Sequence, residues 1–362
     1  MRITQKDIAR DLGISLITVS RAFNNSGYVS EGLKKRILDY AGKKAYVPHR
    51  ASQVLVRNTI RTLALFSSAD PEYFWQDIKK GVLSAAEHLK PFNYEVRYHR
   101  IPDFDTEKYI RILKQEIRAG LDAAAFVNQR IFRMQAILEV AEKAGIPYLL
   151  YNVDNPGTNR LCYIGSNYRS GGRLAANFIG KALKVKRGGK VLVIGFIQGH
   201  EAEIPGTDIN SERLQGFFSV MDGQYPALRC ETEFVNSRSK RPIPRQIHEL
   251  LKKYEHRVDA VYFIPAFNTG FLGALERFDY SNTITVLHDI DDSALHYLDI
   301  NLLTAVVYQD PVLQGYTTVM TLERILESKI LNRQRDVEII HTLIFKENTG
   351  FLRNYILTEF ED

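Results

Sequence analysis

From about residue 60 onward, short apolar segments alternate with amphipathic ones. The apolar segments have strand length and are residues 62–68, 94–100, 122–128, 147–153, 190–196, 259–266, 283–289 and 304–310. The amphipathic segments have helical spacing and are residues 75–89, 134–145, 171–183, 213–221 and 243–254. Such alternation is typical of parallel β-sheets covered by helices. Because these elements are too many for one small sheet, the pattern predicts two α/β lobes.

The N-terminal segment has a different pattern, that of short helices. Thr4 and Ser15 are suited to cap two successive helices, and a third helix is expected over 31–45. Ala9 supplies a small residue where the first two helices would touch, Gly13 a turn, and Val19 an apolar anchor in the second helix. This spacing predicts a helix-turn-helix, whose second helix enters the major groove of DNA.

Positive charge is concentrated in this same segment. Residues 1–62 contain twelve Lys and Arg against four Asp and Glu, a net charge of +8, while the whole chain carries +6, which leaves −2 for the rest. A basic head on a nearly neutral body indicates a polyanionic partner for the head. A solvated basic surface is the alternative that charge alone leaves open.

Several motifs together resemble the lactose-repressor (LacI/GalR) family. In the head they are TVSRAFN at 18–24, VS at 29–30 and YVPHRASQVL at 46–55; in the body, VLHDIDD at 286–292 and VVYQDPVLQGY at 306–316. The resemblance implies a helix-turn-helix domain over 1–46, a hinge helix and linker over 47–59, an effector-binding domain over 60–352 and a tail over 353–362. It also implies a two-lobed periplasmic-binding-protein-like (type I) fold with parallel sheets. Its N-lobe would span about 60–163 and 311–335, and its C-lobe about 164–310 and 336–352.

The resemblance also implies which residues meet DNA. Arg21 would read guanine or hold a phosphate, Leu16 and Ile17 would contact thymine methyl groups, and Leu55 would insert into the minor groove and kink it. A plain linker over 48–56 is the alternative to this hinge helix. The full set of expected DNA-binding residues is Thr4, Ser15, Leu16, Ile17, Thr18, Ser20, Arg21, Asn24, His49, Arg50, Ser52 and Leu55.

Sugar recognition needs aromatic faces for the ring and polar groups for the hydroxyls. Such residues stand near the ends of the expected strands and match ligand positions of the family: Phe74, Trp75, Asn152, Arg213, Asn268, Asp289 and Gln309. For the polar ones the alternative is a capping or loop role, and for the two aromatics it is the core. The basic segment 236–245 would favour an acidic effector unless it is simply a solvated loop.

Motifs for catalysis are missing from the sequence. We find no P-loop, HExxH, GxGxxG or nucleophile elbow, and His288 beside Asp289 is suggestive only in isolation. Cys162 and Cys230 are too few for a cysteine metal site or a disulfide framework. With no apolar signal segment or membrane-length run, we expect a cytoplasmic protein that is not an enzyme and needs no cofactor.

The expected function is therefore that of a homodimeric, sugar-responsive transcription regulator of the repressor type. Two-fold symmetry predicts a pseudo-palindromic operator in double-stranded DNA. Whether the sugar releases the DNA or acts as a corepressor stays open. One rival is a sugar-binding protein for transport or chemosensing, which would need a signal peptide and no basic head. An enzyme fused to a DNA-binding head is a third class, without a catalytic motif to support it.

Overall fold

We analysed a computed structural model of the chain. It describes residues 3–24, 28–44, 59–101, 105–128, 133–184, 188–197, 209–236, 239–265, 268–328, 333–350 and 352. The chain divides into two compact units. One comprises residues 1–61 and 88–95, and the other comprises residues 62–87 and 96–362.

The N-terminal segment folds as three helices, as the sequence predicts. They are α1 (Gln5–Leu12), α2 (Leu16–Asn24) and α3 (Glu31–Lys43). Ile8, Val19 and Ile37, one from each helix, are fully buried and form a shared core. Gly13 ends α1 with a left-handed φ of 67°, a conformation that glycine adopts without steric cost. The glycine in the sequence therefore predicts where the turn between α1 and α2 lies.

Two six-stranded sheets, formed mainly by residues of the larger unit, agree with the two lobes expected from the sequence. The first has the order β11-β5-β4-β3-β1-β2. Its strands are β1 (Arg61–Ser68), β2 (Tyr94–Ile101), β3 (Leu121–Phe126), β4 (Tyr148–Tyr151), β5 (Tyr163–Gly165) and β11 (Val337–Glu338). Its helices are α5 (Glu72–Leu89), η1 (Lys90–Phe92), α6 (Thr106–Arg118), α7 (Met134–Lys143) and α13 (Pro311–Ser328).

The second sheet has the order β12-β10-β9-β8-β6-β7, in which β12 is antiparallel to β10. Its strands are β6 (Lys190–Ile197), β7 (Arg229–Asn236), β8 (Ala260–Phe263), β9 (Ile284–His288), β10 (Ala305–Tyr308) and β12 (Thr342–Ile344). Its helices are α8 (Tyr168–Leu183), α9 (Ile209–Gln224), α10 (Ile243–Tyr254), α11 (Asn268–Leu275), α12 (Asp292–Asp299) and η2 (Lys346–Asn348).

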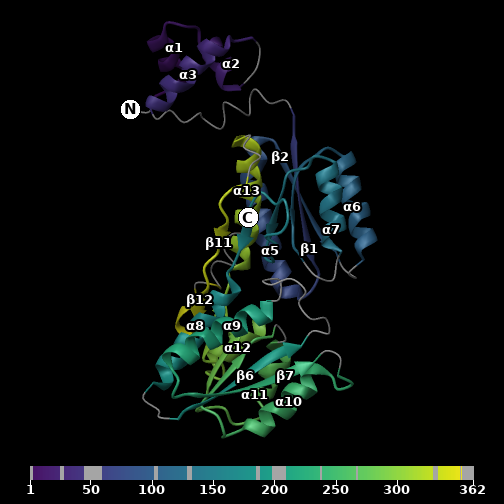
Figure 1. Cartoon of the computed structure of the whole chain (residues 1–362), viewed down its shortest axis with the longest axis vertical. Helices are drawn as coiled ribbons and strands as arrows, with labels where there is room; N and C mark the ends of the chain where they lie inside the picture. The colour runs from purple at the N-terminus through teal and green to yellow at the C-terminus, as the bar shows by residue number, and fades with distance from the viewer. Residues whose placement is uncertain are drawn as a thin grey trace. The chain divides into compact units, whose positions relative to one another are not determined.

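Each sheet is covered by helices on both faces (Figure 1). Side chains of α6 and α7 pack on one face of the first sheet, and α13 lies against β3, β4 and β5. In the second sheet, α8 and α9 cover one face and α10, α11 and α12 the other. Covering both faces buries the inner strands, which explains their continuous apolar runs. Within the described ranges, no helix combines the length and the apolarity that crossing a bilayer requires.

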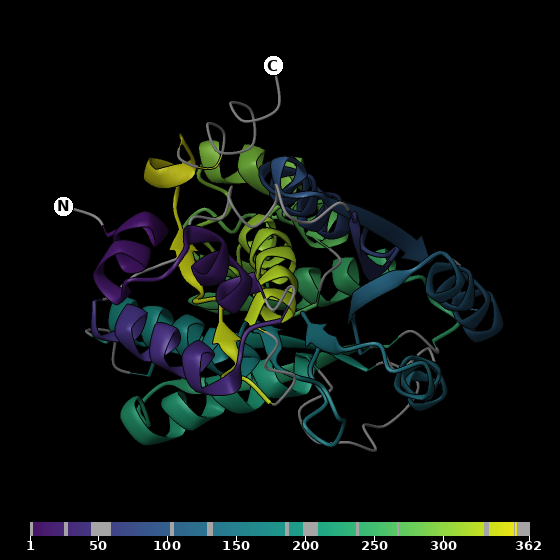
Figure 2. The ribbon, with the colours of Figure 1, turned by 90° about the horizontal axis from the view of Figure 1, so that it is seen from above.

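Two helix pairs approach one another at backbone distance. In the second lobe, α8 and α9 lie side by side (Figure 2), and Cβ atoms on Gly172 and Gly216 would overlap backbone atoms of the facing helix. In the first lobe, Gly81 of α5 and Gly315 of α13 are related in the same way. Only a residue without a side chain fits where backbones touch, so these glycines fix how closely the helices pack.

The chain passes between the sheets three times, and this corrects the expected lobe boundaries. Residues 164–165 in β5 and 337–338 in β11 belong to the first sheet, although the sequence assigned them to the C-lobe. The buried Ser166 hydroxyl lies in the first connection and donates to the carbonyl oxygens of Ile339 at 2.8 Å and Gln309 at 3.5 Å. One side chain thus reaches all three connections.

Candidate functional site

The exposed face of α2 carries the residues expected to read DNA. Leu16 and Ile17 are 48% and 63% exposed, unusually high for large apolar side chains in a folded head, and Arg21 is also exposed. The Ser15 hydroxyl accepts from the Thr18 amide at 3.0 Å and bonds the Thr18 hydroxyl at 2.8 Å, as a residue capping the start of α2 does. This face can therefore offer apolar and cationic contacts from one rigid helix.

The other expected DNA-binding positions are placed as follows. Thr4 caps α1 in a reciprocal capping box with Asp7 and remains exposed. Ser20 is partly buried in α2, and Asn24 is the last residue of that helix. His49, Arg50, Ser52 and Leu55, with the expected hinge helix over 48–56, lie outside the described residues.

In the larger unit, six buried side chains form a closed circuit of contacts that we call the polar ring. Its members are Asn152, Tyr168, Arg213, Asp289, Gln309 and Gln314. The Asn152 amide donates to Gln314 Oε1 at 3.4 Å, and the Gln314 amide donates to Gln309 Oε1 at 3.3 Å and to the Gln309 carbonyl at 2.8 Å. The Gln309 amide donates to Asp289 Oδ1 at 2.7 Å. The ring therefore connects strand ends of both sheets.

Arg213 supplies the only positive charge in the polar ring. Its Nη2 donates to Asp289 Oδ2 at 3.2 Å and its Nη1 to the Ile264 carbonyl at 3.2 Å. Its guanidinium carbon lies 5.6 Å from the centre of the Tyr168 ring, within cation–π range. Arg213 is only 2% exposed and Asp289 6%, so the two charges compensate one another away from water.

Tyr168 closes the circuit back to Asn152. Its hydroxyl donates to the Asn152 carbonyl at 2.6 Å, as does the hydroxyl of Tyr163. Asn152 and Asp289 both follow a strand with a positive φ, 61° and 66° respectively. Asn and Asp tolerate this left-handed conformation better than other residues with a side chain. The backbone thus turns sharply where each strand ends and presents these side chains to the ring.

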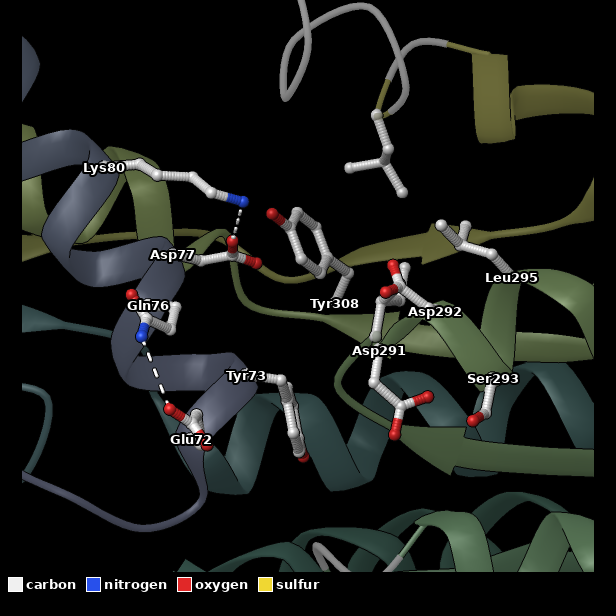
Figure 3. A pocket seen from close by; sticks show the side chains of 12 residues that line it. Glu72, Tyr73, Gln76, Asp77, Lys80, Asp291, Asp292, Ser293, Leu295 and Tyr308 are labelled. Carbon is white, nitrogen blue, oxygen red and sulfur yellow. Dashed lines mark hydrogen bonds and ion pairs between the residues drawn. The ribbon is translucent and has the colours of Figure 1, made fainter. Parts of the chain in front are cut away.

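A cavity of about 480 Å³ (Figure 3) has Ile290 and Tyr308 in its wall, which are the sequence neighbours of Asp289 and Gln309. It is lined by Glu72, Tyr73, Gln76, Asp77, Lys80, Ile290, Asp291, Asp292, Ser293, Leu295, Tyr308 and Leu352. These residues come from α5, from β10 and from the start of α12, together with Leu352. In Figure 3, Tyr73 and the Asp291 carboxylate extend toward the same end of the cavity, while Lys80, Asp77 and Tyr308 gather at the other.

Tyr73 connects the cavity to the polar ring. Its pKa is raised by burial first, and then by the negative charges of Asp289 and Asp291. The Tyr73 hydroxyl and the Arg213 Nε are both buried without a hydrogen-bond partner among the described residues. Leaving such a group unsatisfied costs about 1–3 kcal/mol. A ligand in the cavity that bonded the Tyr73 hydroxyl would recover that energy for this group.

The buried His288 and the half-buried His341 both lie within reach of the Arg213 charge. The His288 Nε2 is 2.6 Å from the Tyr262 hydroxyl, and the rings of His288 and His341 are 6.4 Å apart. Burial, with the nearby Arg213 charge, lowers the pKa of His288 well below its usual range and that of His341 to about 3. Both rings are therefore neutral at physiological pH, so Arg213 faces no second cation there.

The structure brings together four of the seven residues expected to bind ligand. Arg213, Asp289 and Gln309 contact one another directly, and Asn152 joins them through Gln314. Their role as ligand contacts stays a prediction.

The remaining three are placed differently. Phe74 and Trp75 are buried, and the Trp75 indole donates to the Asp70 carbonyl at 2.9 Å. Neither aromatic lines the cavity, which fits the core alternative. Asn268 is the first residue of α11.

Sequence reasoning missed Gln314, Tyr168, Tyr73 and Asp291. Tyr73 and Asp291 lie within two residues of sites that the sequence did identify, so a wider window around each strand end would have included them. Gln314 and Tyr168 gave no local signal, because each is defined by a partner far away in the chain.

Comparison with known proteins places these features in a family. Residues 4–49 match the model described as bacterial regulatory proteins, lacI family, and residues 63–330 match a periplasmic binding protein domain. The HTH-type transcriptional regulator DegA of Bacillus subtilis is 26% identical over 43% of this chain and 45% of its own length. The HTH-type transcriptional repressor PurR of Photobacterium profundum is 25% identical over 60% of each chain. The matched regions thus span less than two thirds of these relatives.

Solved structures support the same fold. The arabinose binding protein AraP from Geobacillus stearothermophilus has a TM-score of 0.66 at 21% identity, covering 81% of this chain and 99% of AraP. A sugar ABC transporter sugar-binding protein from Bacillus halodurans has a TM-score of 0.67, covering 80% of this chain and 99% of that protein, also at 21% identity. The chain therefore belongs to the lacI family of bacterial regulatory proteins, with a periplasmic binding protein domain as its larger part.

Proposed function

We propose that the chain is a sequence-specific DNA-binding transcription regulator of the repressor type. The basic charge of residues 1–62 and the exposed side chains of α2 support DNA binding by the head. The relatives are named as transcriptional regulators and repressors, which supports regulation by binding rather than catalysis. By analogy with the family, the protein is a cytoplasmic homodimer whose two heads read a pseudo-palindromic operator.

The larger unit, in this proposal, senses a sugar-like effector. One observation carries this part: Tyr73, whose buried hydroxyl has no hydrogen-bond partner among the described residues, lines a cavity with polar walls. Ligand sites combine such a cavity with a few convergent polar groups. Asp289, Gln309 and Asn152 are proposed to complete the site, and AraP, which shares the fold, is an arabinose binding protein.

Effector binding is proposed to act through the three connections between the lobes. Ser166 contacts the other two connections, so a ligand that changes the angle between the lobes must change this hydrogen-bonded point as well. The segment 48–56, for which the family resemblance implies a hinge helix, is proposed to carry the change to the DNA. Effector and operator affinities then alter one another by the same factor.

The proposal is tested by measuring DNA binding with and without candidate effectors. Duplexes selected from a random library by the full chain should bind more tightly than scrambled duplexes, and the affinity should fall steeply with salt. Equal affinity for selected and scrambled duplexes would refute a sequence-specific regulator. A sugar that stabilises the protein against heat but leaves DNA affinity unchanged would refute the coupling of effector and operator.

A further inference from the structure

Three cations of the first lobe lie along one side of α6. Arg111, Lys114 and Arg118 follow one another at intervals of three and four residues, the spacing that brings side chains to the same side of a helix. All three are exposed. Together with other residues of the helix, Glu107, Ile110 and Gln115 among them, they line a hollow of about 420 Å³. We call the three cations the α6 basic face.

Carboxylates of the first lobe do not neutralise the α6 basic face. Glu116 of the same helix accepts from Arg97 Nη1 of β2 at 2.7 Å, so its charge is used on the side of the helix that meets the sheet. Glu107 is the one carboxylate among the described residues lining the hollow, against three cations. Lys80 and Arg160 of this lobe have carboxylate partners at 2.7 and 2.6 Å, but within the described residues the α6 basic face has none.

The helix that carries this face is held firmly on its other side. Tyr109 and Leu113 are buried in the core between α6 and the first sheet (Figure 1). At the start of the helix, Asp105 Oδ1 accepts from the amides of Glu107 at 2.9 Å and Lys108 at 3.0 Å. The basic side chains therefore project from a fixed backbone, so a partner that binds them need not order the helix first.

The C-terminal end of this face lies close to the point at which the chain from the head enters the larger unit. α6 ends at Arg118, and β3 begins at Leu121, which pairs with Thr62 of β1. Residues 44–61 join α3 to Thr62, and a segment of this length spans at most about 60 Å when fully extended. DNA bound by the head is thus tethered within about that distance of this end of the sheet.

The charge pattern of the α6 basic face suits a nucleic-acid backbone. From Arg111 to Arg118 the helix rises by about 10 Å. Duplex DNA presents one phosphate charge per about 1.7 Å of its axis, so about six phosphates lie along that length. Exposed Lys and Arg side chains bind such phosphates without reading a base. Because most of the residues lining the hollow are exposed, it does not enclose a single small anion.

We propose that the α6 basic face binds the phosphate backbone of the DNA that flanks the site read by the head. This inference rests on the proposed DNA binding by the head and adds a second contact, made by the larger unit and independent of sequence. Arg111, Lys114 and Arg118 would each neutralise one phosphate. They would raise the affinity for a long duplex and leave the sequence preference to the head.

The test measures how the affinity of the full chain depends on salt for a short and a long duplex. The short duplex contains the selected site alone, and the long one adds flanks of about 20 base pairs, or about 68 Å, on each side. On the long duplex, we expect the Arg111→Gln/Lys114→Gln/Arg118→Gln variant to lose up to about 2.7 from the slope of log affinity against log salt, at about 0.9 per phosphate. On the short duplex its slope should match that of the wild type.

Two further variants separate the face from net charge and from fold. Lys181→Gln/Lys190→Gln/Lys252→Gln removes the same charge from exposed positions of the second lobe and should keep the wild-type slopes. Arg111→Lys/Arg118→Lys preserves the charge of the α6 basic face and should keep them too, since a lysine can hold a phosphate as a point charge. An equal loss of slope in the second-lobe variant would overturn the inference, because net charge would then explain the effect.

The outcomes also separate this inference from the function on which it rests. Equal affinity of the wild type for selected and scrambled short duplexes would count against the proposed regulator, and the present inference would fall with it. Specific binding of the short duplex, with the same slope for the long one, would overturn this inference alone and leave the face to another partner, such as an acidic protein. A slope that increases with the flanks in the wild type and not in the α6 variant is the result expected.

Discussion

A Cβ atom on Gly172 would overlap the carbonyl oxygen of Arg213, so α8 and α9 touch backbone to backbone at the residue that supplies the positive charge of the polar ring. The guanidinium is therefore positioned by helix packing as well as by its hydrogen bonds. Gly216, about one turn further along α9, makes the reciprocal contact with the backbone of Arg169, so the two helices touch at two successive turns.

Replacing Gly172 by Ala should force α9 away from α8. We expect the free energy of unfolding to fall by about 1–3 kcal/mol, the usual cost of overpacking a close contact. Urea unfolding of the full chain measures this. The matched control is Gly223→Ala at the exposed end of α9, where an added Cβ meets nothing within 4 Å and should be neutral or slightly stabilising. Equal effects of the two substitutions would contradict the assigned role of Gly172.

Gln314→Leu should destabilise the larger unit by breaking the polar ring. Gln314 is fully buried, and the change removes its bonds to Asn152 and Gln309. Each group left without a partner costs about 1–3 kcal/mol. In Gln135→Leu the same change is made on the exposed side of α7, and its effect should stay within about 0.5 kcal/mol. If both variants unfold at the same urea concentration, the polar ring contributes nothing measurable to the free energy of unfolding.

Arg21→Ala should weaken binding to a selected duplex while leaving the stability of the larger unit unchanged. Loss of a contact to a base edge costs about 1–3 kcal/mol, which corresponds to roughly 10- to 100-fold in affinity. Arg10→Ala removes the same charge from α1, where Arg10 contacts Asp7 and Asp11, and should change affinity for selected and scrambled duplexes alike. Fluorescence polarisation with both duplexes measures the ratio. A similar loss of discrimination in both variants would refute base reading by Arg21.

Acidification should destabilise the larger unit through His341, whose pKa is lowered in the folded chain. In the folded chain the pKa of His341 is about 3, against an ordinary value of 6.5, so below pH 6.5 the unfolded chain takes up a proton that the folded chain does not. The free energy of unfolding is therefore highest above pH 6.5 and falls toward pH 3, by up to about 1.4 kcal/mol per pH unit for this group.

Urea unfolding at pH 7 and pH 5 gives the size of this effect. His341→Gln should show a smaller loss between the two values than the wild type, since glutamine does not titrate. The exposed His256→Gln serves as the control and should keep the wild-type difference. If the free energy of unfolding of His341→Gln fell between pH 7 and pH 5 by as much as that of the wild type, other groups would account for the acid sensitivity.

The sequence was most informative where a signal repeats locally. Strands such as β1 and β6 are buried on both faces and read as continuous apolar runs, and the three head helices were marked by caps and by Gly13. The edge strand β7 was missed because most of its residues are exposed or half-buried, and the charged Arg229, Glu231 and Glu233 interrupt any apolar run. Its segment consequently resembles a polar loop.

The site was predictable in part for the same reason. Arg213, Asp289 and Gln309 stand out near the ends of recognisable elements. The links supplied by Gln314 and Tyr168 depend on partners 162 and 16 residues away, and no local pattern encodes them. The predicted lobe boundaries differ by a few residues from those in the structure. The reason is that β5 and β11 are only three and two residues long, and tertiary pairing alone decides which sheet they join.

The polar ring and the cavity wall have different parts to play if the ligand of this protein is to be changed. Because its six members bond to one another, they set the scaffold and its charge balance. The cavity wall beside them, at Gln76 and Ser293 for example, has no comparable set of buried bonds. Engineering this protein as a biosensor for a different analyte would therefore begin with substitutions at those wall positions, and the six residues of the polar ring would be left unchanged.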